Sequence, residues 1–273
     1  MLKNKKVGFI GAGMMAEATV RGLLKAGIDT ARVSVSDPDE QRRDFFRSEL
    51  GVGSTADNRS VAQSADIVII ATKPYVVPDV LAEIGSTLKP KQLVVSIAAG
   101  VTIDSIQSKL GTNVPVIRVM PNTPCLIGEG STALAPGKYA TSAHMDLAAE
   151  IFSAVGKVVR VTEDKMDVVT GLSGSGPAYV YTFIEALADG GVRMGLPKSV
   201  ALVLAAQTVA GAARMVLETG EHPAKLRDRV MTPGGTTIAA MASLERSAFR
   251  SAVIEAVTAA TNRSAELGKS KKD

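Results

Sequence analysis

Short apolar runs and longer amphipathic segments alternate along the first part of the chain. The apolar runs are rich in valine and isoleucine and predict strands at Lys6–Ile10, Arg32–Ser36, Ile67–Ala71, Leu93–Ile97, Pro115–Val119, Ser131–Ala135 and Lys157–Val161. The segments between them have a helical period and predict helices at Met14–Ala26, Asp39–Leu50, Val76–Thr87, Ile103–Leu110 and Ser142–Val155. This alternation is typical of an α/β fold, so we expect a doubly wound parallel sheet flanked by helices.

After Val161 the strand-like runs stop and helical patterns follow one another. These helices are expected at Asp164–Gly171, Pro177–Met194, Lys198–Glu218, Lys225–Val230, Thr237–Leu244 and Ala248–Leu267. Several are apolar around much of their circumference, and a small helical domain cannot bury so many faces by itself. We therefore predict two domains, one of residues 1–161 with the sheet and one of residues 162–273 that is all helical and forms a dimer.

The longest nearly apolar run, Val200–Ala213, is interrupted by Gln207 and Thr208. A membrane span needs about 20 apolar residues, so we interpret this run as a buried helix and expect no membrane association. The first strand begins a few residues after Met1, which leaves no room for a signal peptide. We expect a cytoplasmic protein.

Composition and charge exclude several classes of protein. The net charge of +4 comes from lysines at the two ends, residues 3–6 and 269–272, and the chain has no tryptophan and no internal basic stripe. Nucleic-acid binding is therefore not expected. Cys125 is the only cysteine, and His144 and His222 lie far apart in the sequence. These residues indicate neither a disulfide nor a metal site.

A glycine-rich pattern, Gly11-x-Gly13-x-x-Ala16, follows the first predicted strand and opens the first predicted helix. Gly11 permits a tight turn, Gly13 lets the backbone approach a diphosphate, and Ala16 allows close packing of the helix on the strand. The diphosphate would then lie at the helix N-terminus, next to Met14 and Met15. In this context the pattern predicts a Rossmann-type domain that binds a dinucleotide.

Two features near the end of the second strand give opposite indications about the cofactor. Asp37 can accept a hydrogen bond from a ribose 2′-hydroxyl and would repel a 2′-phosphate. Ser36, Asn58 and the pair Arg42-Arg43 could instead contact a phosphate, although two arginines here also fit a solvated helix face. The choice between NADH and NADPH stays open.

Polar residues also stand where other predicted strands end. Ala71-Thr-Lys73-Pro74 and Met120-Pro-Asn122-Thr-Pro124 begin at the ends of two strands, and such ends line the ligand crevice of a doubly wound sheet. The small residues of Ser173-Gly-Ser175-Gly-Pro177 open the helical region and permit close approach to a ligand or to another backbone.

Near the C-terminus, two glycines and two threonines precede an apolar helical pattern in Met231-Thr-Pro-Gly-Gly-Thr-Thr237. Such a loop can direct several backbone N–H groups and a hydroxyl at one small anion. A carboxylate fits this arrangement.

These motifs resemble those of pyrroline-5-carboxylate reductases over nearly the whole chain, from about Val7 to Leu267. The matching segments are Gly8-Phe-Ile-Gly-Ala-Gly-Met-Met-Ala16, Lys73-Pro74, Val94-Val-Ser-Ile-Ala-Ala-Gly100, Arg118-Val-Met-Pro-Asn-Thr-Pro124, Gly171-Leu-Ser-Gly-Ser-Gly-Pro-Ala-Tyr179, Glu221-His-Pro223 and Pro233-Gly-Gly-Thr-Thr237. The resemblance implies a Rossmann domain, an interlocking helical dimer that often joins larger rings of dimers, and NAD(P)H-dependent reduction of Δ1-pyrroline-5-carboxylate to L-proline.

The same resemblance implies roles for individual residues. Thr237 would hydrogen-bond the ring nitrogen of the substrate, and the residues expected to hold the substrate are Thr232, Gly234, Gly235, Thr236 and Ser175. The residues expected to bind the cofactor are Gly11, Gly13, Met14, Met15, Ser36, Asp37, Asn58, Ala71, Lys73, Pro74 and Asn122. Within this set Asn58 is assigned to the ribose, and Lys73, Pro74 and Asn122 to the nicotinamide end.

The chain departs from the family pattern at three positions. Met231 stands where a small residue is usual, Met241 replaces a branched aliphatic residue, and Asp37 stands where phosphate-preferring members often carry serine or threonine. The nearest rival is a hydroxyacid dehydrogenase of the 6-phosphogluconate type, which needs a lysine that Pro177–Phe183 does not contain. A non-catalytic dinucleotide-binding scaffold is the other alternative.

Overall fold

The computed structural model describes residues 2–110 and 113–269 and divides into two compact units. The first unit holds residues up to Ser175 together with the end of the last helix from Ala259, and the second holds Gly176–Thr258. The strands end at Arg160, next to the boundary predicted after residue 161, while the first compact unit continues beyond it. That domain boundary stays a prediction.

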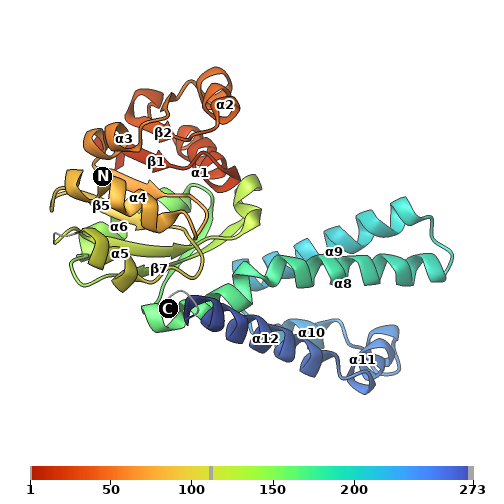
Figure 1. Ribbon diagram of the computed structural model, residues 1–273. Coiled ribbons are helices and arrows are strands. Elements are labelled where there is room, and N and C mark those ends of the chain that lie inside the picture. Colours follow the sequence, from red (N-terminus) through yellow and green to blue (C-terminus); the bar gives the residue numbers. More distant parts are fainter. Residues whose placement is uncertain (1, 111–112, 270–273) are drawn as a thin grey trace. The chain divides into compact units, whose positions relative to one another are not determined.

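An eight-stranded sheet forms the centre of the first unit (Figure 1). Its strands are β1 (Val7–Ile10), β2 (Val33–Ser36), β3 (Gly53–Thr55), β4 (Ile67–Ile70), β5 (Leu93–Ser96), β6 (Val116–Met120), β7 (Gly130–Pro136) and β8 (Gly156–Arg160). Their order is β3-β2-β1-β4-β5-β6-β7-β8, and all neighbours are parallel except β6 and β7. The order reverses between β1 and β4, which is where such sheets bind ligands.

Helices cover both faces of this sheet. They are α1 (Met14–Lys25), α2 (Glu40–Leu50), α3 (Asn58–Ser64), α4 (Val77–Ile84), α5 (Ile103–Leu110), α6 (Ser142–Ser153) and α7 (Met166–Val169). Alternate strand residues point to opposite faces, so Phe9 and Ile69 pack with α1, α2 and α6, whereas Ile10 and Ile70 pack with α3, α4 and α5. The predicted fold class is confirmed.

Two short elements of the first unit were not predicted from the sequence. Strand β3 has three residues and extends the sheet beside β2, and α3 follows it directly. Asp57 caps α3 by accepting hydrogen bonds from the N–H groups of Arg59 and Ser60. Both elements are too short to show a hydrophobic period in the sequence. The capping residue Asp57 was the only sequence signal for them.

The second unit is helical, with α8 (Gly176–Arg193), α9 (Lys198–Thr219), α10 (Pro223–Arg229), α11 (Thr236–Arg246) and the first part of α12 (Phe249–Lys269). Figure 1 shows α8 and α9 side by side. Its residues 176–258 are all described, and those fully buried are Ala188, Ala201 and Ala205. This unit therefore has almost no core of its own.

Helix α9 is largely exposed in the single chain. It is long and apolar enough to cross a membrane by length and composition, yet only 11 % of its most apolar window is buried. Val203 is 68 % exposed and Leu204 54 % exposed. The expectation that this helix is buried stays a prediction that depends on the expected dimer, because α8 covers only one side of it within the chain.

An ion pair joins the sheet to the segment that follows it. Arg118 on β6 is buried, and its Nη1 donates to Oε1 of Glu163 at 3.3 Å. The same carboxylate oxygen accepts from the N–H of Ile103, the first residue of α5, at 2.6 Å. The Glu163 carboxylate thus neutralises the buried Arg118 guanidinium and accepts a hydrogen bond from the first N–H group of α5.

We expect Glu163→Ala to lower the free energy of unfolding by about 2 kcal/mol. Breaking a buried ion pair costs about 3–5 kcal/mol, and the Glu163 side chain is 31 % exposed, which reduces the loss. Urea denaturation measures it. Asp164→Ala removes the neighbouring exposed carboxylate and is the control. Equal midpoints for the two variants would contradict this role of Glu163.

Candidate functional site

The glycine-rich loop joins β1 to α1 and provides the space that a diphosphate needs. Gly11 has φ +99°, and a Cβ built on it would lie 2.8 Å from the carbonyl oxygen of Ala71. A Cβ on Gly13 would meet no atom within 4 Å, and no side chain caps the start of α1. The loop therefore touches the end of β4 on one side and leaves the helix N-terminus open on the other.

Two side chains from the β2–α2 region hold the peptide groups of Ala12. The N–H of Ala12 donates to Oδ2 of Asp37 at 2.7 Å, and its carbonyl accepts from Nε of Arg42 at 2.8 Å. The second carboxylate oxygen of Asp37 accepts from the N–H of Asp39 at 2.9 Å. Asp37 thus anchors the glycine-rich loop, and each of its oxygens keeps a lone pair for a ligand.

The arginine pair is not merely a solvated helix face. Arg42 also donates to Glu17 at 3.0 Å and lies 5.0 Å from the centroid of the Phe45 ring. Arg43 donates to the carbonyls of Asp37 and Pro38, each at 2.8 Å. Burial raises the pKa of Glu17, but hydrogen bonds from Arg42 and Arg21 outweigh it, so the pKa lies below its ordinary value. Glu17 is ionised and competes with any phosphate for Arg42.

Two residues expected to contact the cofactor are engaged with protein groups. Ser36 is fully buried in the sheet, and its hydroxyl faces the Phe9 carbonyl at 3.4 Å. Asn58, the first residue of α3, donates from Nδ2 to Glu83 at 2.7 Å. Their assignment to the cofactor stays a prediction. The Asp37 carboxylate is more available to a ligand than the side chains of Ser36 and Asn58.

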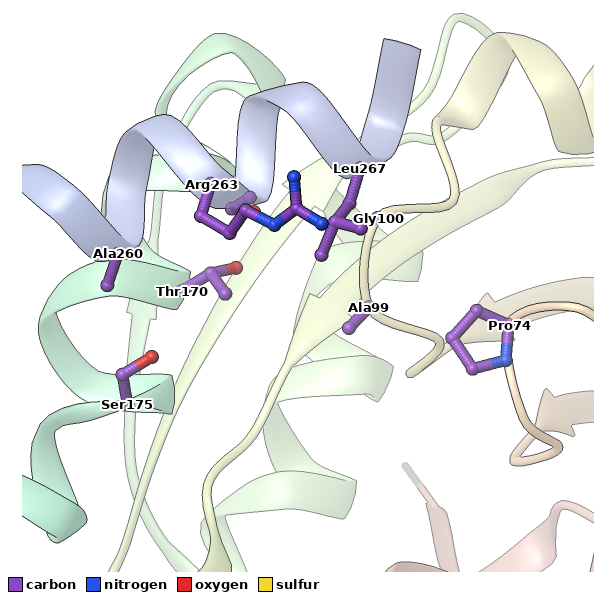
Figure 2. Close-up of a pocket in the computed structure, with 9 residues that line it drawn as sticks. Pro74, Ala99, Gly100, Thr170, Ser175, Ala260, Arg263 and Leu267 are labelled. Carbon is purple, nitrogen blue, oxygen red and sulfur yellow. The ribbon is translucent and has the colours of Figure 1, made fainter. Parts of the chain in front are cut away.

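A cavity of about 350 Å³ lies beyond the carboxyl ends of β4 and β5. Its lining residues are Pro74, Ala99, Gly100, Thr170, Ser175, Ala260, Arg263, Ser264 and Leu267. Figure 2 shows Thr170 and Ser175 on one side, Pro74, Ala99 and Gly100 on the other, and α12 across the top. The cavity therefore brings Pro74, predicted to bind the cofactor, together with Ser175, predicted to bind the substrate.

Helix α12 is fixed over this cavity by a buried contact. Ser264, 7 % exposed, donates to Oδ1 of Asp167 on α7 at 2.7 Å. One residue earlier, Arg263 is the one charged side chain among the described residues that line the cavity, and it pairs with Glu266 at 2.7 Å. Lys73 is exposed and precedes Pro74. A mostly apolar cavity with one cation suits a small anion with an apolar body.

Asn122 follows β6, and both ends of its side-chain amide bind backbone groups. Its Nδ2 donates to the carbonyl of Ser173 at 3.0 Å, and its Oδ1 accepts from the N–H of Ser131 at 2.8 Å. The side chain therefore ties the end of β6 to the turn before Ser175.

The loop Met231–Thr237 lies in the second unit, so it is described separately from the cavity. Gly234 has φ +69°, and a Cβ on Gly235 would lie 2.3 Å from Oγ1 of Thr232. Helix α11 begins at Thr236, and no side chain of the described residues caps it. Thr236 is exposed and Thr237 half-buried. The predicted substrate residues of this loop thus surround an open helix N-terminus, whereas Ser175 lines the cavity of the first unit.

Two residues of the site were missed by sequence reasoning. Thr72 follows β4 beside Gly11, and its Oγ1 is buried with no hydrogen-bond partner. Arg263 enters the cavity from a helix far along the chain. Thr72 stands inside the Ala71–Pro74 motif and could have been noticed, whereas nothing in the sequence around Arg263 indicated a site. The described residues contain no His, Cys, Asp and Glu group that could hold a metal ion.

Two family models cover most of the chain. Residues 163–267 match "Pyrroline-5-carboxylate reductase dimerisation", and residues 6–100 match "NADP oxidoreductase coenzyme F420-dependent". A pyrroline-5-carboxylate reductase of Methanosarcina acetivorans is 46% identical over 98% of this chain and 100% of its own length. The chain belongs to the pyrroline-5-carboxylate reductase family.

Solved structures of this family agree with the fold. The Coxiella burnetii reductase has a TM-score of 0.93 at 42% identity and covers 96% of this chain and 98% of its own. The Plasmodium falciparum reductase, solved with NADP bound, has a TM-score of 0.86 at 34% identity, with 97% and 99% covered. These similarities extend over both compact units.

We expect Thr72→Val to raise the free energy of unfolding by about 1 kcal/mol. A buried hydroxyl without a partner costs about 1–3 kcal/mol, and valine removes it at equal shape. Urea denaturation measures the change. Thr19→Val is the matched control, since the buried Thr19 hydroxyl donates to the Met15 carbonyl at 2.8 Å and its loss is expected to destabilise. A destabilised Thr72→Val protein would contradict this.

Proposed function

We propose that this chain catalyses the NAD(P)H-dependent reduction of Δ1-pyrroline-5-carboxylate to L-proline, the last step of proline synthesis. The observation that carries this proposal is the start of α11, where Gly234, Gly235 and Thr236 surround an uncapped helix N-terminus. Backbone N–H groups and the positive end of the helix dipole favour a carboxylate there. Membership of the reductase family supports this substrate.

The residues around the glycine-rich loop fit a dinucleotide. The open space at Gly13 and the start of α1 suit the diphosphate, Asp37 and Arg42 lie at the adenosine end, and Ala71 and Pro74 lie at the nicotinamide end. A bound NAD(P)H supplies the hydride, and these residues bind and orient it.

The substrate needs orientation more than strong acid–base catalysis. A cyclic imine is already electrophilic, and its reduction requires a hydride at the imine carbon and a proton at the nitrogen. Thr237 is assigned to the ring nitrogen through a hydrogen bond from its hydroxyl, while Thr232, Gly234, Gly235 and Thr236 hold the carboxylate. Arg263 adds a positive charge to the cavity lined by Pro74 and Ser175. Fixed dipoles and positioning then account for the rate.

The experiment that tests this function follows NADH and NADPH absorbance with pyrroline-5-carboxylate. A panel of hydroxyacids with the oxidised cofactors runs beside it. Turnover of the imine and not of the hydroxyacids is expected. Turnover of a hydroxyacid alone would favour the dehydrogenase of the 6-phosphogluconate type, and no turnover of either would favour a binding scaffold.

We also propose that the chain works as a homodimer within a ring of dimers in the cytoplasm. The exposed apolar residues of α9, including Leu202, Val203 and Leu204, lie inside the region that matches the dimerisation model. A second copy of the chain, rather than a membrane, is therefore the proposed cover for this helix.

Thr237→Val is expected to lower kcat/KM for the imine about tenfold to a hundredfold. It removes one hydrogen bond in the transition state, worth about 1–3 kcal/mol, while conserving the shape of the side chain. Cofactor affinity and fold should stay close to wild type. Thr237→Ser keeps the hydroxyl and should restore most of the activity. An unchanged kcat/KM in the valine variant would remove Thr237 from the mechanism.

Asp37→Ser is expected to shift the ratio of kcat/KM values toward NADPH by a factor of about five to thirty. One like-charge contact with a 2′-phosphate in a partly solvated site is worth about 1–2 kcal/mol. Because Asp37 also holds the Ala12 N–H, binding of both cofactors should weaken. Asp39→Ser, which removes an exposed carboxylate two residues away, is the control. An unaltered ratio would show that Asp37 does not face the ribose.

A further inference from the structure

Pro177 leaves one backbone carbonyl of the helical segment without its usual partner. In an α-helix the carbonyl of Ser173 would accept from the N–H of residue 177. Proline has no N–H, and its ring clashes with the carbonyl four residues earlier. Just before this proline the chain forms a π-helical turn at Thr170–Gly174. A hydrogen bond from the N–H of Ser175 to the carbonyl of Thr170, at 2.8 Å, closes this turn.

The side chain of Asn122 supplies the missing donor. Its Nδ2 donates to the Ser173 carbonyl at 3.0 Å, while its Oδ1 accepts from the N–H of Ser131 on β7 at 2.8 Å. Because a carbonyl only accepts and a backbone N–H only donates, these two partners fix which way the amide is oriented. A Cβ on Gly174 would lie 2.8 Å from the Cε atom of Met120, so the turn also packs closely on the end of β6.

This turn presents two hydroxyl residues to the cavity. Thr170, at its start, and Ser175, directly after its end, both line the 350 Å³ space opposite Pro74 and Gly100 (Figure 2). Thr170 and Ser173 also donate from their hydroxyls to the carbonyls of Met166 and Val169. The contact from Asn122 is a side-chain hydrogen bond between the turn itself and the end of β6.

We propose that Asn122 is a positioning residue for the reaction. Through its hydrogen bond to the Ser173 carbonyl, it fixes the position of the cavity wall that carries Thr170 and Ser175. This proposal rests on the proposed function. It differs from the role expected from the sequence, in which Asn122 contacts the nicotinamide end of the cofactor. The hydrogen bonds at 2.8 and 3.0 Å engage one lone pair of Oδ1 and one N–H of Nδ2 before any ligand binds, so they hold the amide in this orientation.

The two roles are separated by the variants Asn122→Asp and Asn122→Ala. Aspartate keeps the shape and the acceptor for Ser131 but loses the donor to Ser173, and alanine loses both. We expect kcat/KM for pyrroline-5-carboxylate to fall about tenfold in Asn122→Asp, the effect of one hydrogen bond of about 1.4 kcal/mol. The Kd for NADPH, titrated without substrate, should change less than about twofold. Ser131→Ala, which keeps the backbone N–H, is the matched control.

The route through Ser173 is tested by adding Pro177→Ala. Alanine restores the N–H at position 177 and gives the Ser173 carbonyl a partner within the helix, so the effect of Asn122→Asp should shrink in this background. Two substitutions that both act on the Ser173 carbonyl are expected to have non-additive effects. Fully additive effects would overturn the proposed route.

Hydrogen–deuterium exchange of the free protein tests the contact independently of the reaction. In Asn122→Asp, peptides that cover residues 170–176 should exchange several-fold faster than in wild type. If the wild-type protein fails to reduce the imine, the proposed function fails while this exchange still tests the contact. A tenfold weaker NADPH affinity with unchanged substrate kinetics, or unchanged exchange and kinetics, would overturn the positioning role of Asn122.

Discussion

Residues 176–258 form helices that cannot bury their own apolar surface. The fully buried residues of this unit are three alanines, whereas Met194 is 84 % exposed and Leu217 66 % exposed. Each Å² of apolar surface left in water costs about 25 cal/mol, so a chain with this surface needs a cover. The region matches a dimerisation model of its family, and the loop Met231–Thr237 belongs to the same unit. The loop predicted to bind the substrate is therefore built on helices whose core depends on assembly.

The sheet unit, in contrast, buries its own apolar core, and side chains hold its glycine-rich loop in place. The glycines at positions 11 and 13 make the space, and Asp37 and Arg42 fix the Ala12 peptide groups between them. A loop fixed before the ligand binds loses less conformational entropy on binding. Asp37 anchors the loop and is also the residue predicted to contact the ribose, so we expect cofactor choice and loop rigidity to be coupled in this protein.

Sequence reasoning succeeded where the signal is local. Runs such as Ile67–Ala71 carry the strand pattern in consecutive residues, and the glycine spacing after the first strand correctly predicted a turn between β1 and α1. It failed for Gly53–Thr55, which is too short to show a period. It could not find Arg263, or the partners of Asn122, because these meet residues far away in sequence.

Sedimentation velocity combined with far-ultraviolet circular dichroism over a dilution series tests the dependence on assembly most directly. We expect a dimer, or a multiple of it, at micromolar concentration, and a loss of helical signal when dilution separates the subunits. Turnover of the imine should fall in parallel. A monomer that keeps its full helical signal and its activity would contradict this dependence on assembly.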